Sequence, residues 1–466
     1  MALFDWDALT RLFISGVERE VAKLAARRPA QTFYALAVMD GYSEEEGPIY
    51  PPLVAMNSVE AARNMHPDAD EHDFWGARWN PGDWQWPDIA VAARELTARY
   101  RTITKLAGSG SIALWRRVCA GQDRAIAAAI AELARRGRRG AGGFAKLRRT
   151  DDFVVYRQDP SDDGPEIARK TIPRATFQRL FPSVGVHRRQ RAAVAKRPAS
   201  DRAQYLISRL GVFEPPVDSE QATEELVAMG GPAVPALIET LDHSEDGRMA
   251  AMVLGRIGMP AAESAIPALR AHARRECPAQ LWSATALGLF GRLDDLMDLA
   301  SDPATQGAAV DGLKSARPAS YPALEELLGR RDRKLERLIR QALAPGSASY
   351  GKTPAAFDAI ARATISPQAI VRMDAASALG DADMGERNRA RAVPILVGLL
   401  SDRSAEVRRL ATLALGWCKR HAKPEIERIR AMKNDPVPAV RVAAENALTE
   451  LGGRGGVAAR ARRAQR

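Results

Sequence analysis

The sequence of 466 residues contains few cysteines, few histidines and no long apolar run. Its three cysteines lie far apart, which argues against a disulfide framework or a zinc site and favours a reducing cytoplasm. No apolar stretch approaches the ~20 residues that a membrane-spanning helix needs. The N-terminal segment is interrupted by Asp5, Asp7 and Arg11, so it is not typical of a signal peptide. These absences predict a cytoplasmic protein without a membrane partner, and the length predicts two or three domains.

Catalytic and cofactor motifs are also scarce. The six histidines are scattered, and no glycine-rich phosphate loop of the Gly-x-x-x-x-Gly-Lys type is present. The segment HPDADEHD at 66–73 gathers carboxylates and imidazoles that could hold a divalent metal, but it lacks the spacing of a known metal-binding loop. We therefore interpret it as an acidic surface loop. The sequence predicts no catalytic residue, no cofactor and no metal site, and it leaves open a site that is assembled only in space.

The net charge of +11 is unevenly distributed along the chain. Residues 101–200 contain 22 basic and 8 acidic side chains, a net charge of +14. Only 11 of the 68 cationic residues are lysine, a pattern typical of a GC-rich bacterial genome, so arginine abundance is a poor indicator of nucleic-acid binding. The Gly/Arg-rich tail at 453–466 is predicted to be disordered. Nucleic acid therefore stays a possible partner of the basic segments rather than the expected one.

Two stretches near the C-terminus repeat each other. Residues 393–416 and 426–452 are each predicted to form an apolar helix that ends in Asp, a short turn, and a second helix that opens with Val-Arg. Asp402 stands six residues before Arg408, and the same offset recurs in the second stretch. Residues 365–380 repeat the second helix of this unit. Self-similarity at this period is typical of stacked helical hairpins.

The repeat extends toward the middle of the chain, where residues 234–258 contain another whole unit. Leucines that close the second helices recur at intervals of 26 to 36 residues. Glycine follows four of these leucines, where a helix commonly ends in a left-handed residue. We expect a positive φ at these four glycines: Gly255, Gly288, Gly380 and Gly416.

These units resemble the HEAT-repeat family over about residues 218–452. The resemblance implies an all-α superhelical solenoid that binds macromolecules, usually proteins, and an acid–base ladder inside the stack. The residues that match the ladder positions, with a structural role, are Asp242, Arg372, Asp402, Arg408, Asp435 and Arg441. Some HEAT-like proteins bind DNA, including repair glycosylases, and HEAT-type repeats also occur in bilin lyases. Nucleic-acid binding and lyase activity are therefore alternatives to protein binding.

One predicted helix of the solenoid, at 328–343, is strongly basic. Arg330, Lys334 and Arg337 share one face of it at helical spacing. Such a face could bind phosphates or an acidic partner surface. It could equally be a solvated face that is balanced by neighbouring carboxylates. We treat these three residues as candidate binding residues.

The first part of the chain has the pattern of a compact α+β domain, at 1–185. An amphipathic N-terminal helix is followed by apolar strands at 32–39 and 53–56, then by helices, by a late strand at 151–159 and by a closing helix. The two early strands are expected to form a hairpin. A basic linker and lead-in helix, at 186–217, connects this domain to the solenoid.

The same region, over about 1–182, resembles an uncharacterised bacterial family known as a domain of unknown function. The resemblance rests on the N-terminal helix, the strand TFYALAVMDG, the motif ARWNPGDW and the strand FVVYRQD. It implies no established activity. Domains of this style occur among bacterial immunity and toxin-neutralising proteins.

Four of the eight tryptophans stand in FWGARWNPGDWQWP, at 74–87. The central NPGD has the composition of a turn. We expect Trp79 and Trp84 to anchor this turn on the domain core. Trp75 and Trp86 are the candidates for an exposed aromatic contact.

The sequence thus predicts a multidomain chain, with an N-terminal α+β domain followed by an all-α HEAT-type superhelical solenoid at 218–452. We interpret it as a non-catalytic bacterial scaffold that binds another protein, with a regulatory or immunity-like role. The binding surface would be the solenoid, with the α+β domain as a second contact or regulatory unit.

Overall fold

The computed structural model divides the chain into two compact units, Met1–Ala192 and Ala193–Arg466. The first contains a sheet and helices, and the second is built from helices. The described residues are 4–39, 41, 48–74, 76–89, 91, 94–108, 112–158, 164–243, 246–344 and 353–452. The tail that we predicted to be disordered, 453–466, lies outside them, as does Trp75.

A three-stranded mixed sheet forms the centre of the first unit, and all three predicted strands are present. The strands are β1 (Phe33–Met39), β2 (Leu53–Ser58) and β3 (Arg149–Gln158), in the order β2-β1-β3. β1 pairs antiparallel with β2, which confirms the expected hairpin, and parallel with β3. β1 is therefore the central strand, which explains why it is apolar along almost its whole length.

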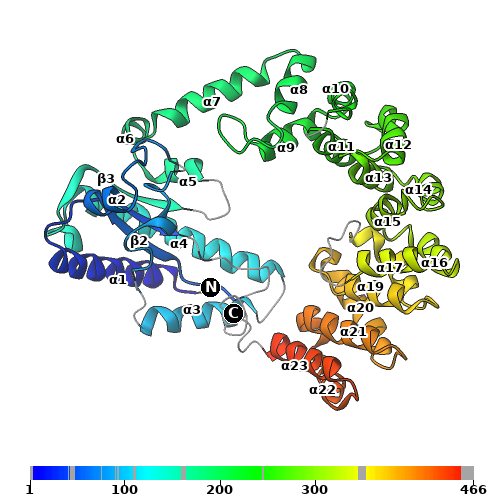
Figure 1. Ribbon diagram of the computed structural model, residues 1–466. Coiled ribbons are helices and arrows are strands. Elements are labelled where there is room, and N and C mark those ends of the chain that lie inside the picture. Colours follow the sequence, from blue (N-terminus) through cyan, green and yellow to red (C-terminus); the bar gives the residue numbers. More distant parts are fainter. Residues whose placement is uncertain are drawn as a thin grey trace. The chain divides into compact units, whose positions relative to one another are not determined.

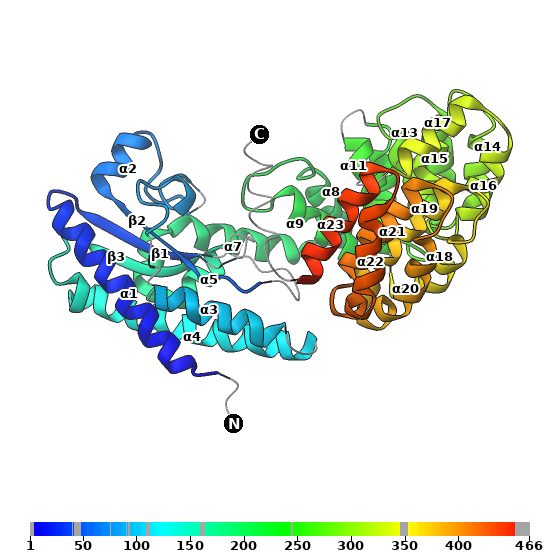
Figure 2. The ribbon, with the colours of Figure 1, turned by 90° about the horizontal axis from the view of Figure 1, so that it is seen from below.

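Helices cover both faces of this sheet (Figures 1 and 2). Leu36 and Val38 of β1 belong to one apolar cluster, and Tyr34 and Ala37 belong to the other. The first cluster packs against α1 (Trp6–Arg27), α3 (Arg94–Ala107) and α4 (Ile112–Arg139). The second packs against α2 (Val59–Met65), α5 (Gly164–Thr171) and α6 (Arg174–Leu180). The result is a three-layer α/β/α arrangement.

The N-terminal helix shows how local sequence sets one of these layers. The Asp5 side chain accepts a hydrogen bond from the Ala8 amide at 2.9 Å and caps α1. Phe13, Val17 and Val21 then follow at helical spacing and are buried. This apolar stripe places α1 against the sheet and α4.

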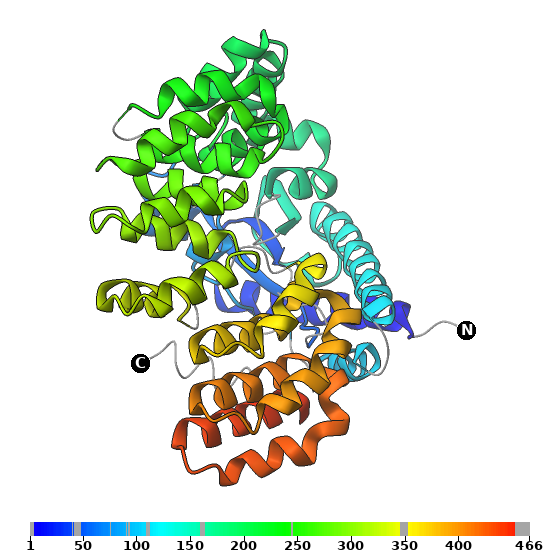
Figure 3. The ribbon, with the colours of Figure 1, turned by 90° about the vertical axis from the view of Figure 1, so that its right-hand side faces the viewer.

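The second unit is a run of helical hairpins, and the lead-in helix α7 (Pro182–Ala195) spans the boundary of the two units. Figure 3 shows the hairpins stacked one on the next. The first helices of the pairs are α8 (Ala199–Ile207), α10 (Val234–Thr240), α12 (Ile266–Arg274), α14 (Leu293–Leu299), α16 (Tyr321–Gly329), α18 (Phe357–Ala363), α20 (Gly385–Leu399) and α22 (Ile426–Ala431). The second helices are α9 (Ser219–Met229), α11 (Asp246–Ile257), α13 (Gln280–Leu289), α15 (Gln306–Ser315), α17 (Arg333–Ala342), α19 (Ala369–Leu379), α21 (Ala405–Trp417) and α23 (Pro438–Gly452).

Within the solenoid, the two sets of helices form two layers. Second helices pack against the second helices of neighbouring hairpins, as α13 does against α11 and α15. Figure 1 shows α11, α13 and α15 on the inner side of an arc, and α10, α12 and α14 on its outer side. One apolar core runs through the whole stack. This arrangement confirms the predicted solenoid.

The glycines near the ends of second helices have a different role from the one we predicted. None of the four, Gly255, Gly288, Gly380 and Gly416, has a positive φ. Each lies close to the next second helix instead: a Cβ at Gly380 would approach Ala414 at 2.7 Å, and one at Gly416 would approach Ala447 at 2.8 Å. Glycine is required there because consecutive second helices nearly touch.

Packing between second helices is sparsest at the step from α17 to α19. A buried polar cluster lies near this step. Arg317 forms an ion pair with Asp374, and the Tyr321 hydroxyl donates to the same carboxylate at 2.8 Å. All three side chains are buried. The cluster adds buried polar contacts to the apolar core that joins the hairpin of α18 and α19 to the preceding repeats.

Candidate functional site

The motif at 77–84 lies on the sheet face that α5 and α6 also cover. The short 3₁₀ helix η1 (Pro81–Asp83) forms its centre, and the Asn80 side chain caps it by accepting from the Gly82 amide at 3.2 Å. Trp79 and Trp84 lie in the core on either side of this turn, and each is 2% exposed. The indole of Trp84 donates to the Arg78 carbonyl at 2.9 Å.

Two tyrosines of the sheet donate hydrogen bonds to backbone carbonyls of this motif. The Tyr34 hydroxyl donates to the Arg78 carbonyl, and the Tyr156 hydroxyl donates to the Trp79 carbonyl at 3.0 Å. Burial raises the pKa of both hydroxyls well above the usual range, so both stay protonated and remain donors. Since Tyr34 is in β1 and Tyr156 is in β3, the motif clamps two strands together. We refer to the motif and these two tyrosines as the aromatic clamp.

The other two tryptophans of the stretch 74–87, which flank the motif, differ from this pair. Trp86 is half-buried, its ring packs 5.2 Å from that of Phe33, and its carbonyl accepts from the Met56 amide at 2.9 Å. Packing against the sheet therefore occupies part of the surface that we assigned to a partner contact. Trp75 lies outside the described residues. An exposed aromatic contact at these two positions stays a prediction.

A cavity of about 680 Å³ opens beside the aromatic clamp, among α5, α6 and the start of α7. Phe177 and Phe181 line its apolar floor. The Phe181 ring packs edge-on against the Trp79 ring at 4.6 Å, so the clamp supports the floor. Sequence reasoning missed this cavity. The available signal was the basic excess of residues 101–200, but helix spacing alone does not show that residues of three helices converge.

In the second unit, arginines of second helices bind the aspartates of the following turns. Arg372 forms two hydrogen bonds to the Asp402 carboxylate, at 2.8 and 2.9 Å. Arg408 repeats this with Asp435, at 2.7 and 3.1 Å, and also donates to the Asp402 carbonyl at 2.8 Å. Arg441 ends the series by donating to the Asp435 carbonyl at 2.9 Å. These five residues form one continuous ladder inside the stack.

The ladder fixes the charge state of its acids. Burial alone would raise the pKa of the Asp402 carboxyl, but hydrogen bonds from Arg372 and the Ser404 amide outweigh it, and the pKa is lowered. At Asp435 the hydrogen bond from Arg408 is the main cause of a lowered pKa. Both acids are therefore ionised at neutral pH. Their role is to hold neighbouring turns in register.

Earlier repeats use other partners at the corresponding turns. Asp242, which the family resemblance placed in the ladder, has an exposed side chain and pairs with Arg275 and His272 of the next repeat. At a further turn, Gln306 donates to the Asp332 carboxylate at 2.8 Å. Sequence reasoning missed this contact because a Gln–Asp pair does not match the Asp–Arg offset.

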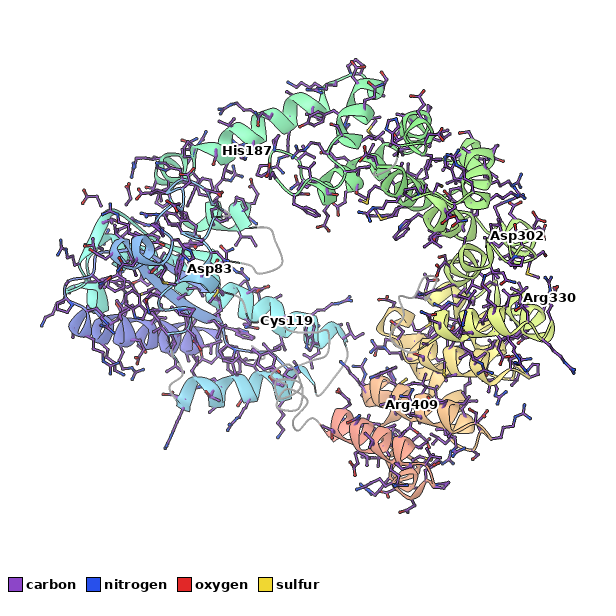
Figure 4. The ribbon with its side chains drawn as sticks, viewed as in Figure 1. Asp83, Cys119, His187, Asp302, Arg330 and Arg409 are labelled. Carbon is purple, nitrogen blue, oxygen red and sulfur yellow. The ribbon has the colours of Figure 1, made fainter. Side chains whose placement is uncertain are left out.

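The prediction of one basic helix over 328–343 is wrong, because α16 ends at Gly329 and α17 begins at Arg333. Arg330 lies in the turn between them (Figure 4), so it does not share a helix face with Lys334 and Arg337. Arg330 pairs with Glu326 at 2.9 Å, and the Lys334 ammonium donates to the Pro303 carbonyl at 2.6 Å. Arg337 is exposed and has no ion-pair partner among the described residues. Two of the three cations thus form contacts within the solenoid.

The segment 66–73 is engaged in contacts of the first unit. Glu71 pairs with Arg78 at 3.1 Å, and its carbonyl accepts from the Trp79 indole at 2.8 Å. A ring nitrogen of His72 lies 2.9 Å from the Leu180 carbonyl. Across the described part of the chain, no three His, Cys, Asp or Glu side chains are grouped to hold a metal ion. In the same residues, no helix combines the length and apolarity that a membrane crossing needs.

Comparisons with known proteins bear mainly on the second unit. No curated protein matches the chain. The solved structures with similarity include two engineered proteins from a structural genomics consortium, at 19% and 18% identity and TM-scores of 0.22. Another is a designed armadillo repeat protein in complex with the peptide (KR)4, at 16% identity and a TM-score of 0.26. Each alignment covers 47% of this chain and 97% to 99% of the other.

The family comparison matches residues 360–449 with the model for HEAT repeats. This match does not reach the first unit, where the resemblance to a domain of unknown function stays a prediction. The matched range contains the pair of α20 with α21, helix α22 and most of α23, together with the whole ladder. Residues 360–449 are therefore HEAT repeats, inside a longer solenoid of the same helical-hairpin design.

Proposed function

We propose that the chain is a non-catalytic scaffold that binds another protein through its HEAT-type solenoid. The observation that supports this most directly is the continuous two-layer stack of hairpins, because such a stack presents a long surface built from many repeats. HEAT-type folds typically bind other proteins. A regulatory or immunity-like role in a bacterial cell is part of the same proposal.

Side chains on this surface suit a protein partner. Leu281 of α13, Trp417 of α21 and Val442 of α23 are large apolar residues with 48%, 38% and 51% exposure. Aromatic and aliphatic side chains of this kind commonly anchor protein interfaces. The cations of the basic face, of which Arg337 is without an ion-pair partner in the described residues, would add charge complementarity at a rim.

The proposal is tested by capture of a binding protein with matched variants. The full chain is immobilised and bound proteins are quantified by mass spectrometry, in parallel with Arg330→Glu/Lys334→Glu/Arg337→Glu. The control Arg11→Glu/Arg19→Glu/Arg27→Glu makes the same change of charge on exposed residues of α1. We expect a stoichiometric protein that the solenoid variant loses by about tenfold and the control retains. Failure to recover any stoichiometric protein with the folded chain contradicts the scaffold function.

Nucleic-acid binding is the second candidate, because exposed cations are concentrated in residues 101–200 and on α17. It makes a different prediction from the scaffold. Affinity for an oligonucleotide would fall steeply with salt, as phosphate contacts release counterions. Salt-sensitive binding that survives deletion of 453–466, with no protein partner recovered, would favour this candidate.

A further inference from the structure

The cavity among α5, α6 and α7 combines an apolar floor with a cationic rim. Phe177 and Phe181 on the floor are 4% and 1% exposed, while Val186 at the edge is 40% exposed. Five of the residues that line the cavity are Arg or Lys, and one is Glu. A ligand that fits must therefore bring both apolar surface and negative charge.

Four of these five cations have no partner in the described residues: Lys170, Arg174, Arg188 and Arg189. The fifth, Arg169, pairs with the single acid, Glu166, at 2.8 Å. Like charges gathered at one opening repel each other, and an anion placed among them relieves this repulsion. The charge of the rim is thus complementary to an acidic ligand.

The shape of the floor argues against nucleic acid. Single strands bind on open aromatic faces on which bases stack. Here the two Phe rings pack on each other at 5.1 Å, and Phe181 also packs on Phe74 at 5.0 Å and on Trp79. Their faces are covered, so the floor offers an apolar depression rather than a stacking platform.

The polar side chains argue against a small metabolite. Small-molecule sites orient the ligand by a few polar groups fixed inside the pocket. Every Arg, Lys, Glu and Gln that lines this cavity is exposed, so the polar groups form a rim of long, movable side chains. Such a rim suits a ligand whose charges extend beyond the cavity on both sides.

We propose that this cavity binds an acidic peptide segment of a partner protein. An apolar side chain of the segment rests on the Phe177–Phe181 floor, and flanking carboxylates pair with Lys170, Arg174 and the α7 arginines. Arginine provides planar donors for such carboxylate pairs. The inference goes beyond the scaffold function of the solenoid, because every residue that carries it lies in the first unit.

The aromatic clamp gives Trp79 a positioning role at this site. Its ring packs edge-on against Phe181, and its carbonyl accepts a hydrogen bond from the Tyr156 hydroxyl. Trp79 therefore holds the Phe181 ring in position, although it is not among the residues that line the cavity. The tryptophan-rich motif at 77–84 thus contacts the floor of the cavity through the Trp79 and Phe181 rings.

The test is fluorescence anisotropy of the full chain with a fluorescein-labelled peptide of repeated Glu-Glu-Phe-Glu. We expect saturable binding that weakens as salt rises. The same peptide with Ala for Phe should bind at least about tenfold more weakly, because it has no side chain for the floor. A peptide of repeated Lys-Lys-Phe-Lys should not bind.

Matched variants locate the site. Lys170→Glu/Arg174→Glu should weaken binding by at least about tenfold, while Arg11→Glu/Arg19→Glu, with the same change of charge on α1, should leave it unchanged. The solenoid variant Arg330→Glu/Lys334→Glu/Arg337→Glu should also bind the peptide normally, which separates this inference from the scaffold proposal. No binding of the acidic peptide, equal loss in both charge-reversal pairs, or binding of an oligothymidylate in place of the peptide would each overturn it.

Discussion

The two units of this chain are held together in different ways. In the first, residues far apart in sequence converge on one point: Tyr34 of β1 and Tyr156 of β3 both bond to the motif around Trp79. In the second, ion pairs of the ladder join one repeat to the next, as Arg372 does with Asp402. A convergent contact links many elements at once, whereas a ladder contact links two. A substitution that removes one such contact should therefore destabilise the whole first unit, whereas in the second unit it should destabilise only the neighbouring repeats.

The largest effect is expected for Trp79→Ala. Removing this 2% exposed indole leaves a cavity against Tyr34, Tyr156 and Phe181 and should destabilise the first unit by about 4 kcal/mol. Amide hydrogen exchange should then accelerate together in all three strands. Trp86→Ala is the control, since this half-buried ring has less packing to lose. If exchange accelerates only around residue 79, the first unit is not held by a convergent contact.

The contrast between convergent contacts and contacts of neighbouring repeats also explains how much of each unit the sequence predicts. The solenoid is predictable because its signals are local: the period of the hairpins and the offset from Asp402 to Arg408 can be read along the chain. The wrong expectation for Gly380 has a tertiary cause, because its neighbour is Ala414 of the next repeat. The Gln306–Asp332 contact was not predicted from the sequence, because a Gln–Asp pair does not match the acid–base pattern.

In the first unit, the strands and the hairpin of the first two were predictable, but the contact with the third strand was not. An apolar run bounded by turn residues indicates a strand, as at 32–39, whereas the parallel pairing of β1 with β3 joins segments separated by most of the domain. Trp79 and Trp84, which we expected to anchor the turn, are both buried, and their anchoring role stays a prediction. The cavity depends on how α5, α6 and α7 are placed around Phe181, which no local pattern encodes.

The next largest effect is expected in the ladder. Asp402→Ala leaves the Arg372 guanidinium, whose side chain is 7% exposed, without its carboxylate, and should cost about 3 kcal/mol. The loss should appear as faster hydrogen exchange in α19 and α21. Exchange in the hairpin of α10 and α11 should not change, because the helices α12 to α17 separate that repeat from this pair along the stack.

A matched control lies on the same helix. Glu406 pairs with Arg409 on the exposed side of α21, so Glu406→Ala should change stability by about 0.5 kcal/mol or less. Acceleration of exchange throughout the solenoid in Asp402→Ala would show that the ladder is as cooperative as the clamp. That result would remove the distinction between the two units.

The smallest effects concern pH, and they have opposite signs in the two units. The folded pKa of Asp402 lies below its unfolded value, so the ionised acid stabilises the fold above about pH 4 and the contribution disappears as pH falls through the folded pKa. The stability difference between the native chain and Asp402→Asn should therefore shrink below about pH 4.

At Tyr156 the folded pKa is raised by burial, so the neutral hydroxyl stabilises the clamp below about pH 10 and the contribution is lost at more alkaline pH. The difference between the native chain and Tyr156→Phe should shrink only there. Urea unfolding across the pH range, followed by hydrogen exchange in β3 and in α21, measures both differences. An acid-dependent Tyr156 difference, or one for Asp402 that persists in acid, would mean that charge does not distinguish the ladder from the clamp. The two units would then differ in connectivity alone.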